Sequence, residues 1–178
     1  MGAIVQRIVL CYTLIMERPS LYLETTIISY LGGRISRDVV VLAHQELTLQ
    51  WWHQQRGNFD MYTSEIVFNE AQHGDKEAAG KRVALLAGIP VLAYTPDVER
   101  LARRYYEELS FPEKALADSF HLAFAIHYSL DYLLTWNCRH LANEILQRRL
   151  VKLNESLQLA TPLIVTPEEL IALSEEEP

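Results

Sequence analysis

The sequence contains few cysteines and no excess of basic residues, and each shortage excludes a class of protein. Two cysteines, Cys11 and Cys138, are too few for a disulfide scaffold, and no Cys-x-x-Cys pair is present to build a zinc ribbon. Lysine and arginine together number 16 against 23 aspartates and glutamates, which gives a net charge of −7. A simple nucleic-acid coat protein needs the opposite balance. A nuclease that binds a divalent cation is still allowed, because the cation supplies positive charge.

Long apolar runs and glycine-rich phosphate loops are also missing. The apolar run from Ile8 to Met16 spans nine residues, whereas a membrane-spanning helix needs about 20. No small-x-small cleavage site follows it, which argues against a secretory signal. We therefore expect a cytoplasmic protein with no membrane segment. The absence of Gly-x-Gly-x-x-Gly, Walker and Gly-x-Ser-x-Gly motifs argues against a nucleotide cofactor and against a serine hydrolase triad.

The length of 178 residues fits a single domain, and the apolar fraction of 49% is enough for a hydrophobic core. We expect residues 1–18 to form an N-terminal extension, with Met16 as an alternative start. Residues 19–173 are predicted to form the domain, and residues 174–178 an acidic tail.

Five short apolar segments alternate with helical patterns along the chain. They are Leu21–Leu23, Met61–Thr63, Val91–Ala93, Tyr132–Thr135 and Leu163–Val165. None alternates apolar with polar residues, so both faces of each strand should be covered. This predicts an α/β fold in which a parallel sheet lies between two helical layers. In such sheets the functional site lies beyond the carboxyl ends of the strands.

Capping residues mark where several of the helices should begin. Helix starts are predicted at Thr25, Asp38, Ser64, Asp75 and Thr95, and a Thr-x-x-Glu capping box is predicted at Thr166. A long helix is expected from about Glu113 to Leu130, and another is expected to resume near Cys138.

Three carboxylates occupy positions near strand ends. Glu24 directly follows the first strand, Glu70 lies in the helix after the second, and Asp118 precedes the fourth within an almost wholly apolar helix. Each could have a simpler role: Glu24 as a helix cap, Glu70 as a solvated side chain, and Asp118 as a partner of a backbone group or an arginine. Three converging carboxylates would repel one another unless a cation neutralised them, and oxygen ligands suit Mg²⁺ or Mn²⁺.

The histidines, tryptophans and arginines carry weaker signals. His121 shares a helix face with Asp118, which fits either a supporting hydrogen bond or simple packing. The five other histidines show no ligand spacing and are interpreted as solvated or capping residues: His44, His53, His73, His127 and His140. Trp51, Trp52 and Trp136 are interpreted as core or interface residues. Basic clusters at residues 100–104 and 148–152 fit solvated faces better than an RNA track.

Three segments carry a resemblance to a known family. Residues Leu21–Tyr30, Ala117–Ala123 and Asp131–Asn143 resemble the PIN domain, and more narrowly its VapC-like branch, the toxin ribonucleases of type II toxin–antitoxin modules. The resemblance runs from about residue 21 to 170. It implies a three-layer α/β/α fold with a five-stranded parallel sheet and RNA cleavage that depends on Mg²⁺ or Mn²⁺.

The resemblance also assigns site residues. The family's three acidic positions fall on Glu24, Glu70 and Asp118, which would bind the metal, and the hydroxyl that supports the first acid falls on Thr26. The family's first acid is usually aspartate, and its frequent fourth acid is replaced here by Asn137, an amide that can orient a ligand without adding charge.

The implied partners are an RNA substrate, an antitoxin protein and a second copy of the chain in a homodimer. Apolar helix faces near Trp51 and Trp52 are the expected dimer surface. Two alternatives stay open: a catalytically silent PIN-like binding module, and an RNA-processing PIN nuclease without an antitoxin.

Overall fold

The computed structural model describes residues 18–176, so the expected N-terminal extension and its apolar run lie almost entirely outside the described residues. Five strands form one parallel sheet. They are β1 (Ser20–Leu23), β2 (Asp60–Ser64), β3 (Val91–Leu92), β4 (Tyr132–Leu134) and β5 (Leu163–Val165). Each agrees with a predicted strand to within one residue at either end. The apolar segments therefore located the whole sheet.

The strand order is β3-β2-β1-β4-β5, which places β1 at the centre. Leu21 pairs with Met61 of β2 on one side and with Tyr132 of β4 on the other. Leu21, Tyr22 and Leu23 have no exposed surface. A central strand covered on both faces has no solvated side for polar residues, and this explains the unbroken apolar sequence of β1.

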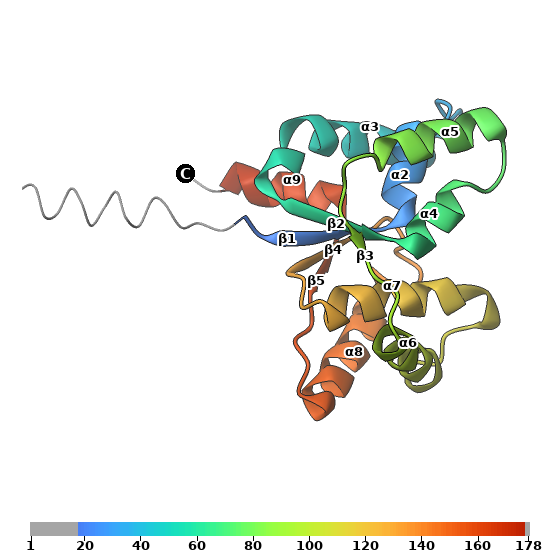
Figure 1. Ribbon diagram of the computed structural model, residues 1–178. Helices are drawn as coiled ribbons and strands as arrows, with labels where there is room; N and C mark the ends of the chain where they lie inside the picture. The colour runs from blue at the N-terminus through green and yellow to red at the C-terminus, as the bar shows by residue number, and fades with distance from the viewer. Residues whose placement is uncertain (1–17, 177–178) are drawn as a thin grey trace, which may run out of the picture.

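Two helical layers cover the sheet (Figure 1). One layer contains α2 (Thr25–Gly32), α3 (Val39–Gln54), α4 (Glu65–Ala71), α5 (Lys76–Leu85) and α9 (Pro167–Glu176). The other contains α6 (Pro96–Glu108), α7 (Leu116–His127) and α8 (Glu144–Leu157). Short 3₁₀ turns occur at Arg56–Asn58 and Glu113–Ala115. The three-layer α/β prediction is confirmed. Within residues 18–176, none of the helices is long and apolar enough to cross a membrane.

Side-chain caps fix most helix starts as predicted. The Asp38 carboxylate accepts hydrogen bonds from the first turn of α3, and the Thr95 hydroxyl does the same for α6. Thr166 and Glu169 form the reciprocal capping box of α9, with bonds of 2.7 and 3.3 Å. Ser64 precedes α4 as expected, but its hydroxyl does not cap the helix. It bonds the hydroxyl of Tyr22 at 2.7 Å instead, which draws Ser64 into the sheet.

Two helix predictions are wrong. The helix expected from Glu113 to Leu130 begins with the 3₁₀ turn, and α7 starts only at Leu116, because Ala115 leaves the helical conformation at φ −107° and ψ 22°. The helix expected near Cys138 begins at Glu144. Before it, the carbonyl of Asn137 accepts two turn hydrogen bonds of 2.9 Å, so the chain stays in turns up to residue 143.

The tryptophans belong to the core, as expected. Trp51 is fully buried, and Trp52 and Trp136 are each 7% exposed. The indole N–H of Trp136 donates to the hydroxyl of Thr48 at 2.7 Å, which satisfies its polar edge inside the protein. At the C-terminus, α9 extends to Glu176 and so includes the first residues of the expected acidic tail.

Candidate functional site

Glu24 lies where β1 ends, and its two carboxylate oxygens have different surroundings. Oε2 accepts hydrogen bonds from the Thr26 amide at 3.1 Å, the Thr26 hydroxyl at 2.5 Å and the Thr135 hydroxyl at 2.7 Å. Among the described residues, Oε1 accepts no hydrogen bond, and it lies 3.8 Å from Nε2 of His121. Glu24 is therefore a helix cap through one oxygen, and its other oxygen is left for a ligand.

Glu70 reaches the same place from α4. Its Oε2 accepts a hydrogen bond from the Thr25 hydroxyl and lies 3.2 Å from Nε2 of His121. The Glu70 side chain is 34% exposed, so it stands at the mouth of the site, whereas Glu24 stands at the bottom with 5%. Glu65, the nearest rival on the same helix, is exposed as expected.

His121 joins the two glutamates. Its ring is 1% exposed, and Nδ1 bonds the Tyr22 hydroxyl at 2.9 Å; that hydroxyl in turn bonds Ser64. This buried chain fixes the ring so that Nε2 points at the carboxylates. Glu24, Glu70 and His121 each offer one donor atom, and the three atoms lie within 4.8 Å of one another. That arrangement fits the ligand chemistry of a divalent cation.

Asp118 lies beside this group, in the first turn of α7. Its Oδ1 accepts a 2.9 Å hydrogen bond from the side-chain amide of Asn137. Its Oδ2 lies 3.2 Å from Nδ1 of His140, although the two atoms are not aligned for a hydrogen bond. The amide at position 137 thus serves Asp118 directly as a donor, which a carboxylate at that position would not do at neutral pH.

Thr26 and Thr135 connect the ends of the two central strands. The Thr26 hydroxyl donates to Glu24 and accepts from the backbone N–H of Trp136 at 2.8 Å. Thr135 donates its hydroxyl to the same Glu24 oxygen and accepts from the N–H of Asn137 at 2.9 Å. The chain after β4 is thereby held against the start of α2, and this sets the place of Asn137 relative to Glu24.

Burial and mutual charge shift the pKa values in this cluster. Burial acts to raise the pKa of Glu70, but the hydrogen bond and charge of His121, with the Thr25 hydrogen bond, hold it below its usual value. Burial acts to lower the pKa of His121, but Glu70, Glu24 and Asp118 together raise it. The pKa of Asp118 is raised, first by burial and then by the charge of Glu24.

Two neighbours of the site were not assigned to it from the sequence. The sequence leaves His121 between a supporting and a packing role, although the Asp118-x-x-His121 spacing on an apolar helix is a usable signal. The interpretation of His140 as solvated or capping does not describe its contacts. Its ring lies between Asp118 and the stacked ring of Phe111. The sequence around His140 contains no pattern that would predict these contacts. His44 also differs from that interpretation, because its ring stacks on Trp136 with centroids 4.0 Å apart.

Comparison with known proteins agrees with this fold. The model of the PIN domain family matches residues 22–140. The structure of VapC20 from Mycobacterium tuberculosis, a toxin that cleaves the sarcin–ricin loop, aligns with a TM-score of 0.54 and 17% identity over 67% of this chain and 92% of that one.

Two toxin–antitoxin complexes also align. VapBC2 from Rickettsia felis, bound to a promoter DNA fragment, has a TM-score of 0.54 and 15% identity over 82% of this chain and 97% of that one. VapBC-1 from nontypeable Haemophilus influenzae has a TM-score of 0.51 and 14% identity over 83% and 98%. A search of curated protein sequences finds no significant match. At these identities the structural likeness concerns the fold.

Proposed function

The chain belongs to the PIN domain family, and from that premise we propose that it is an endoribonuclease that hydrolyses RNA phosphodiesters with Mg²⁺ or Mn²⁺. One observation carries the proposal: Glu24 and Glu70, which are distant in sequence, place donor atoms within 4.8 Å of each other and of His121, and Asp118 lies near enough for Glu24 to raise its pKa. Three carboxylates gathered at low exposure are destabilising unless their charge has a use. A divalent cation provides that use.

The donor set fits such a cation. Glu24 and Glu70 each keep one carboxylate oxygen that accepts no hydrogen bond from any described residue. These oxygens, with the carboxylate of Asp118, would hold Mg²⁺ or Mn²⁺, and Nε2 of His121 lies within reach of the same position. A bound cation would supply Lewis acidity toward a phosphate oxygen and an activated water.

The chain's own residues position these ligands. Thr26 and Thr135 fix one oxygen of Glu24, Thr25 fixes one oxygen of Glu70, and Asn137 fixes one oxygen of Asp118. Each carboxylate thus keeps a second oxygen directed away from its hydrogen-bond donors. On this proposal Thr26 and Asn137 position the ligands, and the three acids bind the metal.

We further propose that the nuclease is the toxin of a type II toxin–antitoxin pair and works in the cytoplasm. Both complexes among the structural neighbours are described as VapBC, and this supports an antitoxin partner. A homodimer is proposed with it. Its surface must use exposed residues of α3 such as Leu49, because Trp51 and Trp52 are buried in the core. Co-expression with the product of an adjacent open reading frame tests the antitoxin, and light scattering tests the dimer.

A second candidate has its own supporting observation. Nε2 of His121 lies 3.2 Å from Glu70 and 3.8 Å from Glu24, so both carboxylates have a partner without any metal, and Asn137 stands where many relatives have a fourth acid. A catalytically silent binding module would need no metal at this cluster. Titration with Mn²⁺ separates the candidates, because a silent module would show no saturable binding at the acidic cluster.

The decisive experiment is cleavage of a mixed RNA pool by the purified protein with Mn²⁺ and with EDTA. Glu70→Gln and Asp118→Asn should each abolish cleavage, because each removes a carboxylate charge at nearly constant shape. Glu65→Gln is the matched control on the same helix, since Glu65 is exposed, and it should cleave normally. Cleavage that persists in EDTA or in Asp118→Asn would refute the assignment.

A further inference from the structure

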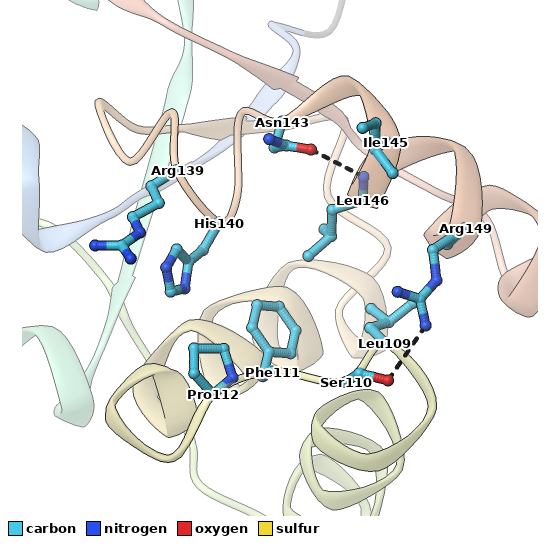
Figure 2. Close-up of a pocket in the computed structure, with 10 residues that line it drawn as sticks. All are labelled: Leu109, Ser110, Phe111, Pro112, Arg139, His140, Asn143, Ile145, Leu146 and Arg149. Atoms are coloured by element: carbon cyan, nitrogen blue, oxygen red, sulfur yellow. Dashed lines mark hydrogen bonds between the residues drawn. The ribbon is translucent and has the colours of Figure 1, made fainter.

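A second concave site adjoins the acidic cluster. Figure 2 shows a pocket of about 260 Å³ between the loop that carries His140, the start of α8 and the loop after α6. Its base is formed by the segment from Leu109 to Pro112. Within that segment Ser110 has a left-handed conformation with φ 58° because it ends α6: its N–H bonds the carbonyl of Glu107 and the N–H of Phe111 bonds that of Tyr106.

The pocket is positively charged in an acidic protein. Arg139 stands on one wall and Arg149 on another (Figure 2), and none of the described residues that line it is acidic. Arg149 is held by the carbonyl of Glu108 at 2.8 Å. Arg139 is exposed and makes no hydrogen bond or ion pair within residues 18–176. An arginine with this freedom can bind a phosphate through two parallel hydrogen bonds.

The start of α8 adds to the positive potential on the same side. Asn143 caps the amide of Leu146 at 3.2 Å, but the amides of Glu144 and Ile145 donate no hydrogen bond within the described part of the chain. Free N–H groups at a helix start favour an anion. Ile145, 74% exposed, gives the pocket an apolar surface beside these donors, and Phe111 lines it with a ring that is only 7% exposed.

The pocket and the acidic cluster share a wall. One side of the His140 ring faces Asp118 at 3.2 Å, and the ring stacks on Phe111, which lines the pocket. A strand of RNA whose reacting phosphate lies at the carboxylates would bring its next nucleotide toward this pocket. An acidic peptide would match the arginines equally well, so the test below has to separate it from RNA.

We propose that this pocket, lined by Phe111, Arg139, Ile145 and the start of α8, binds a nucleotide of single-stranded RNA that neighbours the cleaved bond. The phosphate lies against Arg139 and the first amides of α8. The base lies against the exposed side chain of Ile145. The inference rests on the proposed ribonuclease function and adds the place where the substrate is held.

Two exposed positions test the pocket without disturbing the core. Arg139→Gln removes the free guanidinium, and Ile145→Glu puts a negative charge on the apolar rim. Arg148→Gln is the control for charge, because Arg148 lies on the same helix but pairs with Glu144. Ile35→Glu is the control for the apolar position, because Ile35 is 83% exposed on another part of the surface.

Binding is measured by fluorescence anisotropy of a labelled single-stranded RNA pool, in an Asp118→Asn background that prevents cleavage. Each pocket variant should weaken binding about tenfold, the factor typical of one hydrogen bond to a charged group, and the controls should change it less than about twofold. Arg139→Gln should also reduce the dependence of log affinity on log salt by about 0.7, the value for one phosphate contact on a single strand. The thermal shift caused by Mn²⁺ should stay unchanged when Arg139→Gln is made in the wild-type chain.

The outcomes separate the pocket from the proposed function. If the wild-type protein cleaves RNA with Mn²⁺ but the pocket variants bind RNA normally, the pocket inference is overturned and the nuclease stands. If the variants bind RNA normally but lose the antitoxin, the pocket is a protein-binding site and the inference is again overturned. If the wild-type protein neither binds Mn²⁺ nor cleaves RNA, the nuclease proposal fails and the subsite fails with it.

Discussion

Asp118→Asn should make the metal-free protein more stable while it removes the response to metal. The substitution keeps the shape of the side chain. The new amide oxygen can accept the 2.9 Å bond from Asn137, and the new NH₂ group replaces the oxygen that lies 3.2 Å from His140 without a hydrogen bond. No hydrogen bond is lost, and the main change is the loss of one negative charge from a cluster that already contains Glu24 and Glu70.

The direction of the change follows from linkage. Because the folded protein raises the pKa of Asp118 above 3.8, the stabilising contribution of its proton is fully present below that value and is lost as the pH rises through the folded pKa. Asparagine mimics the protonated form at every pH. We expect a gain of about 0.5–2 kcal/mol in the free energy of unfolding at pH 7, the range typical of relieved functional sites. For this length that is roughly 1–8 °C in melting temperature.

The metal response moves in the opposite direction. A cation at 100 times its dissociation constant stabilises a folded protein by about 2.7 kcal/mol, or roughly 5–11 °C here. We expect this shift with Mn²⁺ in the wild-type protein and little of it in Asp118→Asn. Thermal melts in EDTA and in Mn²⁺ measure both effects.

Asp97→Asn is the control, because Asp97 pairs with Arg100 on an exposed surface, and such a change is expected to stay within about 0.5 kcal/mol. An Asp118→Asn protein that is less stable in EDTA, or that keeps the full shift with Mn²⁺, would refute the reasoning.

Three further predictions concern the same cluster. Tyr22→Phe removes the buried partner of His121 Nδ1 and should cost about 1–3 kcal/mol in the free energy of unfolding; a urea midpoint equal to that of the wild type would contradict it. Asn137→Asp replaces the amide donor to Asp118 with a fourth acid. Calorimetry should therefore find tighter Mn²⁺ binding, and urea denaturation in EDTA should find a lower free energy of unfolding. A variant unchanged in both measurements would count against the site. The third prediction concerns pH in EDTA. Because the folded protein raises the pKa of His121, this group contributes stability below pH 6.5, and that stability is lost as the pH rises through its folded pKa. Because the folded protein lowers the pKa of Glu70, this group contributes stability above pH 4.5, and that stability is lost as the pH falls through its folded pKa. Urea midpoints against pH should therefore decline below about pH 4.5 and above about pH 6.5. In an Asp118→Asn background, which removes the contribution of Asp118, a His121→Asn variant that still declines on the alkaline side would disprove the role of His121.

The sheet could be predicted from the sequence because its strands are buried on both faces. A short apolar run such as Leu21–Leu23, followed directly by a helical pattern, is typical of a buried parallel strand. Helix starts could also be predicted from the sequence where a side chain caps the helix, as Asp38 does for α3. In both cases the deciding interactions lie within a few residues of one another or depend on burial alone.

The errors occur where distant contacts decide the structure. The helix expected near Cys138 begins six residues later, and Asn137, just before the expected start, is bonded to Asp118, 19 positions away. The place of His140 depends on residues 22 and 29 positions away, Asp118 and Phe111. The spacing of His121 from Asp118 could have indicated a role in the site. The Tyr22 and Ser64 hydroxyls that orient its ring, however, come from β1 and β2, far from α7 in the sequence. No local pattern contains that information.

The bond between Glu24 and Thr135 joins residues 111 positions apart, and this sets an order in time. At a synthesis rate of about 5–20 residues per second, roughly 6–22 seconds pass between the two residues on the ribosome. A nascent chain that already carries Glu24 and Glu70 has Thr25 and Thr26 but still lacks Thr135, and it also lacks Asn137, which bonds Asp118. The acidic cluster can therefore take its final form only after the chain has been synthesised past β4.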